Sequence, residues 1–127
     1  MKLAINQSVD CTVYAKQRWN STGVQLEAGH TYSLEASGKW TDLTISSGPD
    51  GFTKWYMKWA EKRRRVKEAN WFALIGTYGG DNPFIIGSGI QSLTAQVSVQ
   101  LICFANDAEG FYWNNSGAVR LTVVRKS

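Results

Sequence analysis

Short runs of alternating apolar and polar residues recur along most of this chain, and they limit its fold more than any other feature. The pattern is clear in residues 9–15, 22–26 and 31–37, and later strand segments are residues 72–78, 84–87, 93–104 and 118–125. A period of two is typical of strands that bury one face, and the Gly- and Asn-rich stretches between these segments are typical of turns. Many short strands of this kind favour a β-sandwich or a jelly roll. The sequence therefore predicts an all-β fold.

The length of 127 residues predicts one domain spanning residues 1–127, large enough for a single core. No apolar run approaches the roughly 20 residues of a membrane span. The segment Met1–Gln7 lacks the apolar core of about 7–15 residues that a secretory signal needs, so we expect a cytoplasmic protein, with release by another route left open. Cys11 and Cys103 lie in strand patterns, which favours buried free thiols in a reducing compartment.

Residues 53–68 do not follow the alternation and form a basic insert. Trp55, Trp59 and Val66 are four and seven residues apart, close to one stripe of an amphipathic helix. Between Lys58 and Glu68 there are six cations and two carboxylates, a local charge of +4 that equals the charge of the whole chain. The rest of the sequence is therefore neutral in sum, and the basic character belongs to this insert.

Two interpretations of the basic insert stay open. Clustered cations with tryptophans are typical of surfaces that bind nucleic-acid phosphates or an anionic membrane. Alternatively, the cations form a solvated face and the tryptophans pack on the sandwich. No helix-turn-helix or RNA-binding signature accompanies the insert, so nucleic acid is the second-ranked partner.

The loop from Ala105 to Gly117 is the strongest candidate for a binding site. It is longer than the roughly two to five residues of a usual hairpin connection. Its oxygen-bearing side chains are Asn106, Asp107, Glu109, Asn114, Asn115 and Ser116. Calcium prefers about six to eight oxygen ligands from carboxylates, amides and carbonyls. Asp107, Asn114 and Asn115 therefore make a candidate metal site, although Asn and Gly are also common in turns without a ligand.

Several short motifs carry a resemblance to a known family. They are Asn106-Asp107, Gly110 and Asn114–Gly117 in the long loop, Gly48-Pro49-Asp50-Gly51, Ser37–Trp40, Ala73–Gly76 and Phe84–Gly87. In order and spacing the chain resembles the calcium-dependent galactophilic bacterial lectins of the PA-IL type, from about residue 24 to residue 124. The closing loop is the most specific part of this resemblance.

The resemblance implies a calcium ion that binds two vicinal sugar hydroxyls. Its implied ligands are the side chains of Asp107, Asn114 and Asn115 and the backbone carbonyls of Phe111 and of either Asp42 or Leu43. The implied sugar contacts are Asp107, Ala108 and Asn114. Relatives of this type are multivalent, so a homo-oligomer is also expected.

The chain differs from the family in the loop whose side chains contact the sugar. The loop after Gly51 lacks the family's sugar-binding histidine and glutamine, so both a galactose-like sugar and another diol-bearing sugar stay open as the ligand. We expect Trp55, Tyr56 or Trp59 to form an aromatic platform for the sugar ring. Trp113 stands where the family has a small residue, and we expect it to narrow the sugar pocket or to become part of it.

Two rival functions compete with sugar binding. Enzymatic activity is not expected, because His30 is the single histidine and no catalytic triad or clustered metal-hydrolase pattern is present. An interaction module that kept the lectin-like fold and lost the metal stays open as the main alternative.

Overall fold

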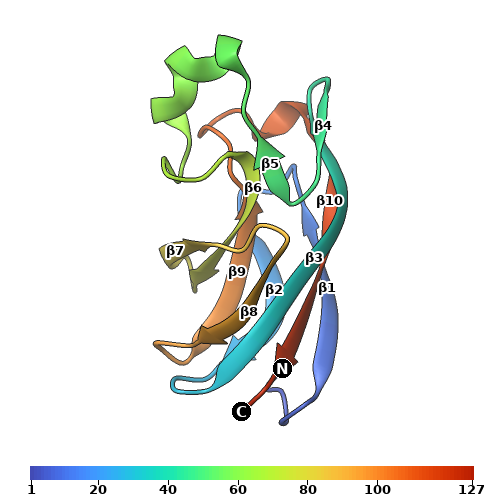
Figure 1. Cartoon of the computed structure of the whole chain (residues 1–127), viewed down its shortest axis with the longest axis vertical. Coiled ribbons are helices and arrows are strands. Elements are labelled where there is room, and N and C mark those ends of the chain that lie inside the picture. The colour runs from blue at the N-terminus through green and yellow to red at the C-terminus, as the bar shows by residue number, and fades with distance from the viewer.

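The computed structural model consists of two antiparallel β-sheets that pack face to face (Figure 1). It describes the backbone of residues 1–127 and every side chain except those of Trp55 and Tyr56. The strands are β1 (Ser8–Tyr14), β2 (Asn20–Leu26), β3 (Thr31–Asp42), β4 (Ile45–Ser47), β5 (Asp50–Phe52), β6 (Trp71–Tyr78), β7 (Asp81–Ile85), β8 (Gly89–Thr94), β9 (Val99–Ala105) and β10 (Asn115–Arg125). The predicted all-β sandwich is confirmed. Within the described chain, no helix has the length and apolar character needed to span a membrane.

Strands that are distant in sequence are neighbours in both sheets. The first sheet has the order β1-β10-β3-β4, with β8 also paired to β3, and the second has the order β2-β9-β6-β5, with β7 also paired to β6. Strands β10 and β3 pair along their whole length, from Arg125 opposite Tyr32 to Asn115 opposite Asp42. This register brings Asn115 and Asp42 together at the end of the sandwich opposite the two chain termini (Figure 1).

Strand β6 is buried on both faces, unlike the strands whose outer face meets water. Its Phe72 and Leu74 belong to the core between the sheets. Its Ala73 and Ile75 point to the opposite side, where they pack in a second apolar cluster with Val66, Ala69 and Phe104. Val66 near the end of the basic insert and Ala69 just after it therefore cover the outer face of β6, which explains the continuous apolar run of this strand.

Trp40 and Phe72 join the two sheets directly below the long loop. Their rings meet edge to face with centroids 5.9 Å apart, and the indole N–H of Trp40 donates to the carbonyl of Phe72 at 3.1 Å. Phe72 has a φ of +61°, which is strained for a bulky residue. Gly51 lies beside it with a φ of +75°, and a Cβ at that position would come 2.1 Å from the carbonyl oxygen of Trp71. Glycine is thus required at position 51 of β5 by close backbone approach.

The basic insert contains a helix, but a shorter and tighter one than its pattern indicates. The 3₁₀ helix η1 spans Trp55–Arg63, and the next residue, Arg64, has an extended backbone. A 3₁₀ helix has about three residues per turn, so residues four and seven apart do not share a face. Val66 is buried beyond the helix, whereas Trp59 is 76% exposed. The prediction that Trp59 packs on the sandwich is therefore wrong, and the prediction for Trp55 falls outside the described side chains.

Both cysteines are free, as predicted. Cys103 is fully buried, and Cys11 is partly buried with its Sγ 3.5 Å from the carbonyl oxygen of Leu121. Burial raises the pKa of the Cys11 thiol to about 11, and it also raises the pKa of Cys103. Both thiols are therefore protonated at neutral pH, which makes them poor nucleophiles and poor metal ligands.

Candidate metal and ligand site

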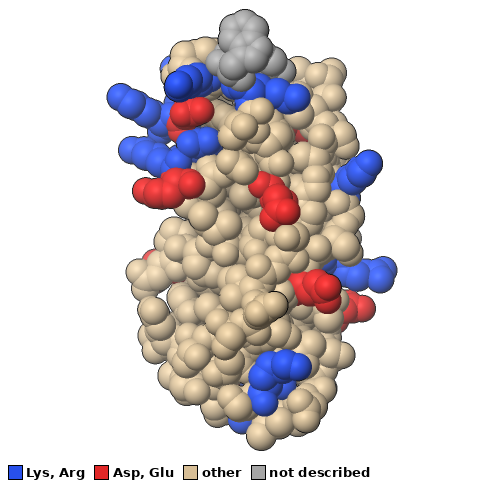
Figure 2. All heavy atoms as spheres, in the orientation of Figure 1, with Lys and Arg blue, Asp and Glu red and all other residues tan. Residues whose placement is uncertain are grey.

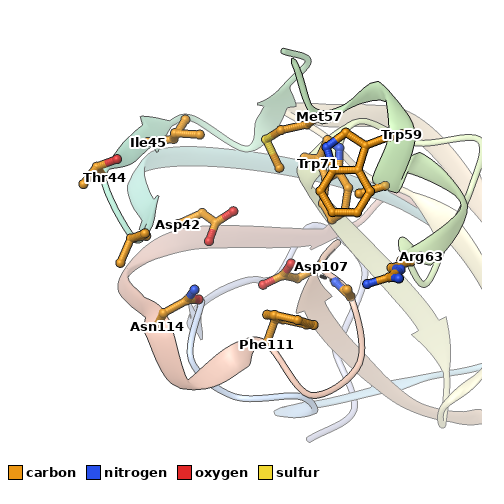
Figure 3. A pocket seen from close by; sticks show the side chains of 13 residues that line it. Asp42, Thr44, Ile45, Met57, Trp59, Arg63, Trp71, Asp107, Phe111 and Asn114 are labelled. Atoms are coloured by element: carbon orange, nitrogen blue, oxygen red, sulfur yellow. Dashed lines mark hydrogen bonds between the residues drawn. The ribbon is translucent and has the colours of Figure 1, made fainter. Parts of the chain in front are cut away.

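A pocket opens at the end of the sandwich where the β3–β4 turn, η1 and the long loop meet (Figure 3). Its cavity volume is about 360 Å³. Its lining residues are Asp42, Leu43, Thr44, Ile45, Met57, Trp59, Ala60, Arg63, Trp71, Asp107, Ala108, Phe111 and Asn114. The structure therefore brings most of the residues predicted for metal and sugar binding to one cavity.

Asp107 is held rigidly on one wall of the pocket and is only 3% exposed. Its Oδ1 accepts a hydrogen bond from the N–H of Ala108 at 2.8 Å, and its Oδ2 accepts one from Nδ2 of Asn115 at 3.0 Å. The same Nδ2 donates to the carbonyl of Ala15 at 3.0 Å. Asn115 does not line the pocket itself, but it fixes the orientation of Asp107 from behind.

Two buried amide oxygens, one on this wall and one behind it, have no hydrogen-bond donor among the described atoms. They are Oδ1 of Asn114 and Oδ1 of Asn115, and both are buried. A buried acceptor without a partner costs about 1–3 kcal/mol, so proteins rarely leave one unsatisfied. Two such oxygens next to a buried carboxylate indicate that something else satisfies them.

The electrostatics of the wall also favour a cation. Burial, with a smaller contribution from the neighbouring carboxylate of Asp42, raises the pKa of Asp107 to about 6, although the hydrogen bonds from Asn115 and Ala108 act to lower it. Burial raises the pKa of Asp42 as well. Two carboxylates that are both costly to ionise lie at one wall, and a bound cation would offset this cost by favouring their charged forms.

The donor chemistry of the wall fits calcium. Every candidate ligand is an oxygen, from a carboxylate, an amide side chain or a backbone carbonyl, which is the set that a hard cation prefers. Among the described residues, no group of three His, Cys, Asp or Glu side chains is present that could hold a metal by itself. The residues present thus suit a cation that accepts amides and carbonyls, rather than one that requires thiolate or imidazole ligands.

The β3–β4 turn and the long loop are joined at the pocket by their backbones. The N–H of Leu43 donates to the carbonyl of Asn114 at 3.1 Å, and Leu43 has a φ of +54°. The Asn114 carbonyl is therefore used inside the protein, while its side-chain oxygen is left without a partner. Phe111 lies on the pocket wall directly before the short 3₁₀ helix η2 (Tyr112–Asn114).

Trp113 lies on η2 but does not line the pocket. Its side chain is 68% exposed, and it projects away from the cavity that its neighbour Asn114 borders. The expectation that Trp113 borders the sugar site is not met by this geometry.

The second wall comes from the basic insert, and sequence patterns indicated only one of its members, Trp59. Met57, Trp59, Ala60 and Arg63 of η1 and Trp71 of β6 face the oxygen-rich wall across the cavity (Figure 3). No local pattern identifies these residues as pocket residues, because their position depends on how the β5–β6 connection folds over the end of the sandwich.

Asn106 connects this insert to the long loop. It is fully buried, and its Oδ1 accepts the N–H of Val66 at 2.9 Å. Its Nδ2 donates to the carbonyls of Val66, Ala69 and Asn70 at 2.9, 3.2 and 3.0 Å. Asn106 is therefore a structural residue that holds the end of the insert, rather than a candidate metal ligand.

Arg65 is also used within the protein and is not part of an exposed basic surface. Its side chain is only 7% exposed, and its guanidinium carbon lies 3.4 Å from the centroid of the Phe104 ring. Its Nη1 donates to the carbonyl of Arg18 and to the hydroxyl of Tyr112, at 2.7 and 2.8 Å. The exposed cations of the insert are Lys54, Lys58, Lys62, Arg63 and Lys67. Figure 2 shows Lys and Arg side chains gathered at the end of the molecule where η1 lies.

Comparison with known proteins identifies the fold. No protein-family model matches this chain, and no curated protein matches it in sequence. A solved structure described as "EclA N-terminal domain; PllA-like lectin" superposes with a TM-score of 0.73 at 21% sequence identity, and the match covers 91% of this chain and 94% of that chain. The chain therefore has the β-sandwich fold of this PllA-like lectin domain.

Proposed function

We propose that this protein is a lectin that binds a sugar diol with the help of calcium. The observation that carries the proposal is the pair of buried, unpartnered oxygens of Asn114 and Asn115 beside the buried carboxylate of Asp107. The similarity to a PllA-like lectin domain supports the same conclusion at the level of the fold. Asp107, Asn114, Asn115, the carbonyl of Phe111 and a group of the Asp42–Leu43 turn would hold the ion. When bound, calcium supplies open coordination positions for two neighbouring hydroxyls.

The chain's own residues orient the sugar in this proposal. Asp107 and Asn114 present acceptors at the pocket wall, and a charged acceptor strengthens the hydrogen bond from a sugar hydroxyl. The exposed ring of Trp59 offers an apolar surface to the sugar ring from the opposite wall. Because Asn115 already positions Asp107, little ordering is needed when the ligand arrives.

Binding at a single site is expected to be weak and to depend on pH. Few carboxylates contribute charge, which places calcium affinity toward the range of about 10⁻⁴–10⁻³ M found for extracellular modules. Asp107 must be ionised to hold a cation, so affinity should rise as the pH rises through about 6. We propose that a homo-oligomer compensates for weak single sites by multivalent binding.

A glycan array in the presence of calcium and of chelator tests the proposal. Wild type should bind glycans only with calcium, and calcium should raise the melting temperature because it binds the folded state. Asp107→Asn should abolish both effects, whereas Asp81→Asn, which changes an exposed carboxylate at the β6–β7 turn, should retain them. Absence of both effects in wild type would favour an interaction module that lacks the metal.

The exposed cations of the insert support a second candidate, binding of an anionic polymer such as nucleic acid. Two arginines of the insert do not contribute to such a surface. Arg65 is buried, and Nη2 of Arg64 donates to the carbonyl of Lys67 at 2.6 Å. It predicts similar binding to heparin and DNA that disappears at moderate salt and after the exposed lysines of the insert are neutralised. Calcium would have no influence on such binding.

A further inference from the structure

We infer that the ligand of this pocket is an acidic sugar, and that Arg63 recognises its carboxylate. The inference rests on the proposed function and specifies its substrate class as a hexuronate-type saccharide. It follows from the chemical difference between the two walls of the cavity and from the unused guanidinium on one of them.

The two walls offer opposite hydrogen-bonding chemistry. The wall of Asp42, Asp107 and Asn114 carries acceptors, which suit a cation and sugar hydroxyls. The wall from η1 and β6 carries donors, namely the guanidinium of Arg63 and the indole N–H of Trp71. This N–H is buried and has no acceptor among the described atoms. A ligand that satisfies both walls therefore has hydroxyls at one end and an acceptor, preferably charged, at the other.

Arg63 is available for such a ligand, unlike the arginines near it. Arg18 and Arg65 both pair with Glu109, with N–O distances of 2.6 and 3.2 Å. Within the part of the chain whose side chains are described, Arg63 forms no ion pair or hydrogen bond. Its guanidinium lies 5.6 Å from the centroid of the exposed Trp59 ring. This stacking orients the guanidinium and leaves its donors in the pocket.

The backbone holds Arg63 beside the metal-binding loop. The next residue, Arg64, pairs with Ala108 in an isolated β-bridge, and the N–H of Arg65 donates to the carbonyl of Asp107 at 3.1 Å. The end of η1 is thereby fixed against the loop that carries the acceptor wall. Figure 3 shows Arg63 and Asp107 on facing sides of the same opening.

A hexuronate has the arrangement that these walls require. Its ring hydroxyls include vicinal pairs, and the carboxylate replaces the exocyclic hydroxymethyl group of the neutral hexose. A cavity of about 360 Å³ lies in the size range of small-ligand sites, so a single sugar ring can reach both walls. The planar guanidinium matches a carboxylate with two parallel hydrogen bonds, and without Arg63 the acidic wall would disfavour an anionic ligand.

Calorimetric titration with matched sugars tests the inference. With saturating calcium, galacturonate and glucuronate are compared with galactose and glucose, for wild type, Arg63→Gln, Arg63→Lys and Lys62→Gln. Wild type should prefer the acid of at least one pair by about tenfold, which corresponds to about 1.4 kcal/mol. Arg63→Gln should lose this preference, and Arg63→Lys should retain part of it. Lys62→Gln removes the same charge from the neighbouring residue outside the pocket and should keep the preference.

Two further readouts distinguish a direct contact between Arg63 and the carboxylate from long-range electrostatic attraction to the basic insert. The preference for the acid should weaken only modestly with salt if the carboxylate pairs in the pocket, because a contact pair is screened less than distant charges. In a ¹H–¹⁵N spectrum, the Nε–H resonance of Arg63 should shift with the uronate and not with the neutral sugar.

The outcomes distinguish this inference from the proposed function. Equal affinity of wild type for acid and neutral sugars, unchanged in Arg63→Gln, would overturn the inference and leave the calcium-dependent lectin intact. If Lys62→Gln abolished the preference for the acid as fully as Arg63→Gln, the inference would also be overturned. The preference would then come from the overall positive charge of the insert and not from a contact with Arg63. Failure of every sugar and glycan to bind with calcium would remove the proposed function and the inference with it.

Discussion

Replacing Asp107 by Asn should remove the contribution of this carboxyl group to the pH dependence of stability in the calcium-free protein. The pKa of Asp107 is raised by burial from 3.8 to about 6, so the folded state binds a proton more tightly than the unfolded state. The resulting stability is fully present below about pH 4 and is lost as the pH rises through about 6. A pKa difference of about 2 corresponds to about 3 kcal/mol, which is the upper limit of the cost of the charged carboxylate at neutral pH.

The Asn variant removes this cost but loses part of the hydrogen bonding. Both oxygens of Asp107 accept hydrogen bonds, whereas Asn has one oxygen and leaves one donor unpaired, at a cost of about 1 kcal/mol. Asp107→Asn should therefore stabilise the calcium-free protein by about 2 kcal/mol at pH 7.5 and destabilise it by about 1 kcal/mol near pH 4.

Urea unfolding at a series of pH values, in chelator, measures this effect. The curves of wild type and Asp107→Asn should cross between pH 4 and pH 7, while Asp81→Asn should run parallel to wild type. Saturating calcium at pH 7.5 should then stabilise wild type and leave Asp107→Asn unchanged. Parallel curves for Asp107→Asn and wild type would refute the reasoning, because Asp107 would then not be a buried carboxylate that is costly to ionise.

Other substitutions test how the pocket is held in place. Asn106→Ala removes four hydrogen bonds of a buried side chain and should lower the free energy of unfolding in urea by about 4 kcal/mol, while Gln91→Ala on the surface should change it by less than about 0.5 kcal/mol. Arg65→Met should cost about 2–3 kcal/mol and Lys62→Met close to nothing, since only Arg65 is buried against aromatic rings; equal losses would contradict this. Trp59→Ala should leave the melting temperature nearly unchanged and weaken sugar binding, and a drop of several degrees would show that Trp59 contributes to packing.

The sandwich was predictable because each strand carries its own periodicity. Alternation in residues 9–15 and 31–37 indicates which face is buried before any partner strand is known. The pairing of β10 with β3 was not predictable in this way, because register depends on contacts between residues far apart in sequence. The burial of Ala73 and Ile75 was also unexpected, since it depends on the cover supplied by Val66 and Ala69.

The candidate site was only half predictable, for the same reason. Asp107, Asn114 and Asn115 lie in one loop, so their proximity follows from local sequence. The structure adds that Asn115 positions Asp107 from behind the pocket. Arg63 comes from a segment more than forty positions earlier in the chain and reaches the pocket through long-range backbone contacts. A helical pattern also misplaced Val66, because the insert folds as a 3₁₀ helix that ends at Arg63.

A crystal structure of the protein with calcium and a bound sugar tests the central claim most directly. The account predicts an ion about 2.3–2.6 Å from oxygens of Asp107 and Asn114, with two vicinal sugar hydroxyls completing its coordination. An empty acceptor wall at saturating calcium, with Asn114 and Asn115 turned to partners within the protein, would contradict it.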